Sequence, residues 1–335
     1  MDLSAAAHGP KNFLGAAIFW LYVLFALAFT ATIASTLFEL HQRHRVTDNN
    51  ALRTRHVWVF GFFSLLSFST LSFNMLEVLI QSFQLWSHGQ YPSLLTGYLA
   101  AIWNWSITSN LFQDFGEAIV ANSARFLWTQ SALLATIAVC FFMAMQGRQH
   151  NVPRLWAFFC ISQILPISFA QNLFYVALLL SKRDETQPAR VPKLMSVATL
   201  ALYCSCLANA QLTAGTAWLL PLILVARVFL LVPWALVTKQ NEGKRETERQ
   251  SDQYLATEGI IPVLTLTSLV MTAIKVWQIK DEGWTLESAW NALFSHPAVS
   301  SLGCDFILST FSFVAWSLLS DESIGKSGIG QRKRQ

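Results

Sequence analysis

Long apolar stretches, separated by shorter polar segments, follow one another along most of the chain. An α-helix needs about 20 residues to cross the hydrocarbon core of a bilayer. The stretches that meet or approach this length predict a polytopic all-α transmembrane bundle of about eight helices, and we expect residues 1–335 to form a single integral-membrane domain. The predicted spans are Phe13–Leu40, His56–Phe83, Phe126–Met145, Leu155–Leu180, Leu194–Leu212, Ala217–Thr238, Gly259–Gln278 and Val299–Leu319.

The segment between the second and third spans, residues 84–125, has a different pattern. It is too polar for a further span and too long for a simple turn. Asn110, Asp114 and Glu117 recur at the spacing of one helical face, with aromatic residues between them. Such a segment can rest at the membrane interface. We therefore predict an interfacial or re-entrant cap segment here.

The composition agrees with a membrane protein. Only 13% of the residues are charged and 53% are hydrophobic, whereas a soluble domain carries roughly 25% charged residues. The lipid bilayer is thus the expected environment. The net charge of +4 is spread over loops and tail, which argues against nucleic acid as a partner.

Two acidic residues lie where charge is unfavourable. Glu77 and Asp305 each fall inside a predicted span, and an Asp at a helix centre costs roughly 2.5 to 3.5 kcal/mol on insertion scales. Acids in such places are usually neutral, paired or facing a cavity. We therefore predict that both are functional, as the catalytic residues.

Each of these acids belongs to a polar stripe on one face of its helix. Two such stripes indicate helices that face a common cavity. Interhelical hydrogen bonding is the alternative, because Ser, Thr, Asn and Gln commonly join membrane helices. The stripes consist of Thr70, Asn74, Glu77 and Gln81 in the second span and of Ser301, Asp305, Ser309 and Ser312 in the eighth.

Further polar side chains are candidates for the lining of that cavity. Arg227, a cation well inside a span, is expected to neutralise an acid. Asp114 and Glu117 are second-rank acids in the cap. The predicted substrate-binding residues are Asn74, Gln81, Asp114, Glu117, Gln171, Asn172 and Asn209.

The sequence lacks the motifs that several common classes of enzyme require. It contains no Asp-rich segment to hold Mg²⁺ against a diphosphate, no phosphate-binding loop, no Gly-x-Ser-x-Gly elbow and no His-rich box. The five cysteines show no metal-ligand spacing with histidine. We therefore predict neither a metal nor another cofactor. Acid chemistry remains, because a carboxyl group in an apolar cavity stays protonated and aromatic faces can stabilise a carbocation.

Three stretches resemble a known family: Trp128–Leu134 (WTQSALL), Arg154–Phe159 (RLWAFF) and Leu165–Phe174 (LPISFAQNLF). They are similar to fungal eight-helix integral-membrane terpene cyclases of meroterpenoid pathways, such as those to ascochlorin, ascofuranone and macrophorin. The resemblance is strongest over residues 103–180. It implies an isomerisation without metal, in which acid starts the cyclisation of a farnesyl chain, often epoxidised, on an aromatic polyketide.

Smaller, seven-helix fungal cyclases use a Glu early and an Asp late in the chain, and Glu77 and Asp305 have a similar order by analogy. We therefore predict a membrane-bound terpene cyclase acting on a prenylated aromatic epoxide. A proton-coupled transporter or exporter of a hydrophobic secondary metabolite is the alternative. A third possibility is a structural membrane protein whose acids pair with Arg227.

The loop charges predict an orientation. More Lys and Arg residues lie on the side that holds the termini if the chain crosses eight times, which favours a cytosolic location for both termini. Residues 321–335 predict a basic flexible C-terminal tail. Its end, Arg332-Lys333-Arg334-Gln335, resembles a dibasic retrieval signal and predicts the endoplasmic reticulum membrane.

Overall fold

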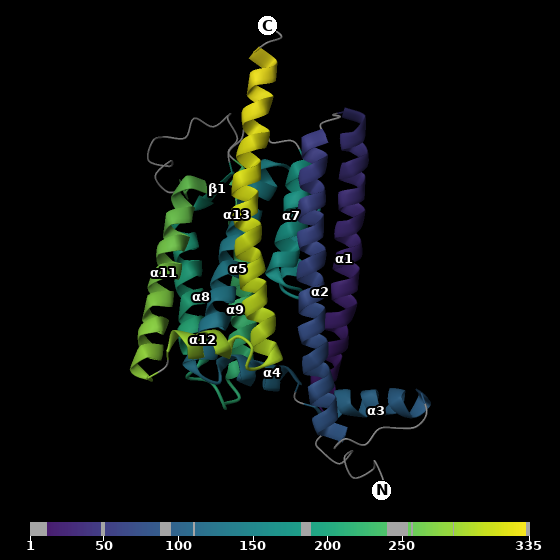
Figure 1. Cartoon of the computed structure of the whole chain (residues 1–335), viewed down its shortest axis with the longest axis vertical. Helices are drawn as coiled ribbons and strands as arrows, with labels where there is room; N and C mark the ends of the chain where they lie inside the picture. The colour runs from purple at the N-terminus through teal and green to yellow at the C-terminus, as the bar shows by residue number, and fades with distance from the viewer. Residues whose placement is uncertain are drawn as a thin grey trace.

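The computed structural model describes residues 12–47, 51–87, 95–109, 111–181, 189–239, 254–255, 257–283 and 285–332. Seven helices in these ranges are long and apolar enough to cross a membrane, and they stand side by side along the long axis of the molecule (Figure 1). The prediction of an all-α polytopic bundle is confirmed. The seven helices are α1 (Phe13–Thr47), α2 (Ala51–Ser87), α5 (Ser123–Gln149), α8 (Lys193–Ala210), α9 (Leu219–Leu236), α11 (Thr257–Asp281) and α13 (Pro297–Arg332).

Three shorter helices gather at the end of the bundle where α1 begins, which we call the entry end. They are α3 (Leu95–Thr108), α4 (Leu111–Val120) and α12 (Leu286–Ala292), and α3 lies across this end (Figure 1). The indole of Trp86 donates to Thr108 Oγ1 at 2.8 Å and that of Trp105 to Ser82 Oγ at 3.2 Å, which fastens α3 to α2. The helices α3 and α4, within residues 84–125, thus lie at this end of the bundle, and the interfacial location stays a prediction.

The predicted span Leu155–Leu180 is not one helix. It consists of α6 (Leu155–Ser162) and α7 (Ile167–Leu180), separated by residues 163–166. Pro166 explains the break, because proline lacks an N–H group and disfavours helical geometry in the residue before it. With 14 residues, α7 is about 21 Å long, short of the hydrocarbon thickness of about 30 Å.

The contacts of α6 and α7 show that this pair turns back inside the bundle. Arg154, at the start of α6, contacts Glu39 near the far end of α1, whereas Ile164, beyond α6, contacts Tyr22 much earlier in α1. The helix α7 then runs parallel to α13 and returns to the end from which α6 came. The pair is a re-entrant hairpin, whose tip is the break.

The re-entrant hairpin changes the number of crossings. The start of α1 and the end of α13 lie at opposite ends of the bundle (Figure 1), and we call the end where α13 stops the exit end. The prediction that both termini face one side required eight crossings and does not fit this path. The expected flexible tail, residues 321–335, is described as far as Arg332, where it continues α13; its last residues lie outside the described ranges.

A small antiparallel sheet joins loops at the exit end. Its central strand β1 (Ala189–Pro192) pairs with β2 (Thr238–Lys239) on one side and β3 (Tyr254–Leu255) on the other. The sequence did not predict these strands, since two to four residues leave too short a periodic pattern.

The helix α5 forms the centre of the bundle. It packs against α7, α9, α11 and α13, and it is the most buried of the long helices. Beside it, Tyr175 of α7 stacks on Trp316 of α13 with ring centroids 4.5 Å apart, and Phe60 of α2 packs edge-on against Tyr175. This aromatic cluster holds α2, α7 and α13 together.

Candidate active site

Asp305 lies at the tip of the re-entrant hairpin. Its two carboxylate oxygens accept hydrogen bonds from the backbone N–H groups of Ile167 at 2.9 Å and Ser168 at 2.8 Å, the first two residues of α7. The first N–H groups of a helix have no partner within it and carry partial positive charge. The start of α7 therefore compensates the charge of Asp305, which is 8% exposed.

The end of α6 has the complementary arrangement. The guanidinium of Arg227 donates to the carbonyl of Gln163, and the hydroxyl of Tyr22 donates to the carbonyl of Ile164. A cation is favourable at the C-terminal end of a helix. Arg227 was expected to neutralise an acid, but its partner is this carbonyl, and the ion pair found within the described ranges joins Arg154 and Glu39. Asp305 and Arg227 thus satisfy opposite sides of the break.

Gln171 and Asn172 continue the contact between α7 and α13. Gln171 donates to the hydroxyl of Tyr175 at 2.7 Å and accepts from that of Ser309 at 2.5 Å. Asn172 donates to Ser312 Oγ at 2.9 Å. Both amides are buried. The polar stripe of the eighth predicted span therefore forms interhelical hydrogen bonds, which was the alternative reading of that stripe.

Glu77 lies apart from Asp305, in the half of α2 that leads to the entry end. Its Oε1 accepts a hydrogen bond from Gln81 Nε2 at 3.3 Å, one helical turn further on. Asn74 donates back to the carbonyl of Thr70 within the same helix. Glu77 is half-buried, and its partner Gln81 extends toward a cavity at this end.

This cavity, which we call the entry cavity, has a volume of about 290 Å³. It brings together α2, α4 and the residue before α13. Two predicted site residues, Gln81 and Asp114, line it. The complete lining consists of Val78, Gln81, Ser82, Leu85, Trp86, Ser109, Leu111, Asp114, Phe115 and His296.

His296 is a titratable lining residue that the sequence analysis did not single out. Its Nδ1 accepts a hydrogen bond from the backbone N–H of Ala298 at 3.1 Å, so the proton of a neutral ring lies on Nε2. Burial lowers the pKa of His296, the nearby Arg125 lowers it further, and Glu77 opposes them. The lowered pKa favours the neutral ring, whose Nε2–H is a hydrogen-bond donor. A solitary His before a Pro carries no spacing signal in the sequence.

Asp114 brings an acid into the entry cavity. Burial raises the pKa of its carboxyl group, and the charge of Glu117 raises it further. Glu117 itself accepts the backbone N–H of Gly215 with both carboxylate oxygens, each at 2.8 Å, and so holds the turn between α8 and α9. Asp114 therefore keeps its proton to a higher pH than a free aspartic acid.

Asn209 is outside both polar regions. Its side chain is exposed on α8 and donates to the carbonyl of Ser205 in the same helix. The structure therefore brings the predicted residues into two places rather than one common cavity. Asp305, Gln171 and Asn172 join α7 to α13, whereas Gln81 and Asp114 line the entry cavity beside Glu77.

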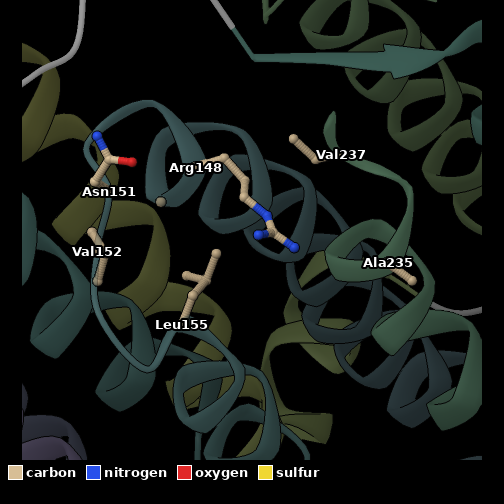
Figure 2. Close-up of a pocket in the computed structure, with 7 residues that line it drawn as sticks. Arg148, Asn151, Val152, Leu155, Ala235 and Val237 are labelled. Atoms are coloured by element: carbon tan, nitrogen blue, oxygen red, sulfur yellow. The ribbon is translucent and has the colours of Figure 1, made fainter. Parts of the chain in front are cut away.

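A second and larger cavity, of about 550 Å³, lies at the exit end. No predicted site residue lines it. The guanidinium of Arg148 extends into it from the end of α5, as Figure 2 shows. We call it the exit cavity; its lining consists of Gly147, Arg148, Asn151, Val152, Leu155, Ala235 and Val237.

The polar residues of the WTQSALL stretch connect α5 to three other elements. Trp128 donates to the carbonyl of Ala289, Thr129 to that of Ile119, and Gln130 to that of Met271. These contacts position helices rather than line a cavity.

The chain matches no protein-family model, no curated protein and no solved structure.

Proposed function

We propose that the protein is a membrane-bound terpene cyclase that starts its reaction with a carboxyl proton in the entry cavity. One observation carries this proposal: an acid and a histidine from separate elements line one cavity, and a second acid lies beside it. Asp114 of α4 and His296 before α13 line the cavity, and Glu77 of α2 accepts a hydrogen bond from Gln81, which also lines it. A volume of 290 Å³ is near the lower end of small-molecule sites, which span about 300 to 1,000 Å³.

The substrate class follows from the resemblance together with the position of the cavity. A prenylated aromatic epoxide has a polar ring that suits the water-facing end of a membrane protein and an apolar chain that suits its interior. The entry cavity offers both environments, because Gln81, Ser82 and Ser109 lie beside Leu85 and Phe115. The basic end of the chain supports the endoplasmic reticulum membrane as the proposed location.

In the proposed reaction, Asp114 donates its proton to the epoxide oxygen and the bond from that oxygen to the more substituted carbon breaks. The π electrons of a neighbouring alkene form the new carbon–carbon bond. The final carbocation loses a proton to the Glu77 carboxylate, so the product is an isomer of the substrate. Trp86 and Phe115 line the cavity and supply aromatic faces that can stabilise the cation.

His296 and Gln81 have orienting roles in this scheme. The Nε2–H of His296 can donate a hydrogen bond to the substrate oxygen, because Nδ1 of this ring already accepts the N–H of Ala298. Gln81 is bonded to Glu77 and lines the cavity, so it links the proposed proton acceptor to the bound substrate.

Asp305 receives a different role here from the one predicted for it. Both of its oxygens are occupied by the start of α7, and it does not line the entry cavity. We propose that it holds the helix break and that Asp114 supplies the proton. Turnover of an Asp305 variant that remains folded decides between the two roles.

The decisive experiment uses the full chain, purified into lipid nanodiscs, and a farnesylated phenol epoxide. We expect an isomer of equal mass, formed without added metal, and ring closure seen by NMR. Heat-inactivated protein is the control for spontaneous opening in acid. Unchanged substrate, tested across several phenol rings and pH values, would contradict the proposal.

The re-entrant hairpin favours the transporter as the second candidate. Broken helices within the membrane are typical of transport sites, where irregular backbone lines a path for the substrate. A transporter would move the same compound into vesicles under a pH gradient and leave its structure unchanged. Gradient-driven uptake without an isomer would therefore replace the cyclase proposal.

A further inference from the structure

The exit cavity lies where three helices meet the boundary of the bundle. Its walls come from the end of α5, the start of α6 and the end of α9. Both α5 and α9 are candidate membrane spans that end here, so the cavity is at the level of lipid headgroups. Gly147 brings α5 close to Leu155, because a Cβ atom at this glycine would be 2.4 Å from a Leu155 methyl carbon.

Arg148 places a positive charge in this cavity. Its side chain extends from the last turn of α5 toward Ala235 and Val237 (Figure 2). Within the described ranges its guanidinium forms neither a hydrogen bond nor an ion pair. The neighbouring Arg154 differs, since Glu39, Ser35 and Thr36 hold it.

The remaining lining is mostly apolar, and α9, which supplies part of it, carries exposed apolar side chains. Val152, Leu155, Ala235 and Val237 form the apolar part of the cavity. Below it, α9 exposes Leu224, Val228 and Trp234, which are 52%, 60% and 37% exposed. A free inorganic anion would gain nothing from contact with this apolar surface, whereas the acyl chains of a lipid would bury apolar area against it.

We propose that the exit cavity binds the phosphate group of an anionic phospholipid. The planar guanidinium of Arg148 would pair with the phosphate oxygens, and the acyl chains would lie on the exposed face of α9. In membrane proteins, the side chain of an arginine near the end of a span often extends toward the lipid headgroups. A concave site of 550 Å³ adds selectivity for one bound lipid.

Native mass spectrometry of the purified full chain tests this site, with phosphatidylglycerol and phosphatidylcholine of matched acyl chains as probes. We expect one phosphatidylglycerol to be retained preferentially. The Arg148→Gln variant should bind it about tenfold more weakly, as expected for the loss of a charge-assisted hydrogen-bond donor. Lys193→Gln is the matched control, because Lys193 is exposed at the same end and does not line the cavity.

A second variant keeps the test independent of charge and folding effects at Arg148. Ala235→Phe fills the apolar part of the cavity and should also weaken phosphatidylglycerol binding while Arg148 remains. Equal losses in Arg148→Gln and Lys193→Gln would overturn the proposal, as would equal retention of the two lipids. Displacement of the lipid by inorganic phosphate at equal concentration would overturn it in favour of a site for free anions.

Discussion

Asp305 accepts a hydrogen bond of 2.8 Å from the backbone N–H of Ser168, a residue 137 positions away in the sequence. The bond joins the first third of α13 to the start of α7. With the matching bond from Ile167, it satisfies the backbone at a helix break inside the bundle. Irregular backbone at membrane depth is tolerated where protein groups satisfy it, and Asp305 is such a group.

Replacing Asp305 with Asn should destabilise the fold. The amide would lose the negative charge and direct an N–H group toward a backbone donor, and each charge-assisted hydrogen bond contributes about 1.5 to 3 kcal/mol. We expect a loss of about 2 to 3 kcal/mol in unfolding free energy, measured in detergent. Asp281→Asn, at an exposed acid, is the control. Normal stability without cyclisation would restore Asp305 as the proton donor.

The contacts at the end of α6 should have coupled effects on the unfolding free energy. Arg227→Met and Tyr22→Phe each remove a donor to one of two adjacent carbonyls, so each should lower the unfolding free energy by about 1 to 3 kcal/mol. Once one bond is lost, the loosened tip should make the second loss smaller. A double-mutant cycle measures this coupling, and effects that add within about 0.5 kcal/mol would show that the two contacts are independent.

His296 predicts an acid-sensitive stability. Its pKa in the folded protein is below the ordinary value of 6.5, so the unfolded chain binds the proton more readily. The stabilisation is complete above about pH 6.5 and is lost as the pH falls through the folded-state pKa. His296→Asn keeps a side-chain acceptor for the N–H of Ala298 but does not titrate. Its melting temperature should therefore fall less between pH 7.5 and 5.5, and an equal fall would contradict this role.

Glu117 predicts a shift in the pH dependence of activity. Its charge contributes to the raised pKa of Asp114, so Glu117→Gln should lower that pKa. Since the protonated form of Asp114 is the proposed donor, turnover should then decline at a lower pH than in the wild type. The pH–rate profile measures this shift. Glu287→Gln, at an exposed acid of α12, should leave the profile in place.

Much of the fold could be predicted from the sequence, because a span of about 20 apolar residues is a local signal. The turn at the hairpin tip could not. Pro166 marks an interruption, but a kinked span and a re-entrant hairpin share that signal. The difference depends on Asp305, Arg227 and Tyr22, which lie far from Pro166 in the sequence.

The candidate site was predictable to a smaller extent. The helical spacing of Asp114 and the stripe that ends at Gln81 pointed to two residues that line the entry cavity. The inference from two polar stripes to one common cavity did not hold, because periodicity gives a face of each helix but not the neighbour that it meets. Only the packing of α7 against α13 shows that Ser309 and Ser312 bond to amides.

The most direct test of the proposed mechanism compares the rate of single-turnover cyclisation in three variants that are folded to the same extent as the wild type. Removing a general acid or base lowers rates by about 100- to 10,000-fold. We predict that Asp114→Asn and Glu77→Gln each bind the prenylated phenol epoxide but form the isomer at least about 100-fold more slowly, while Asp281→Asn matches the wild type. Wild-type rates in both Asp114→Asn and Glu77→Gln would contradict acid chemistry in the entry cavity.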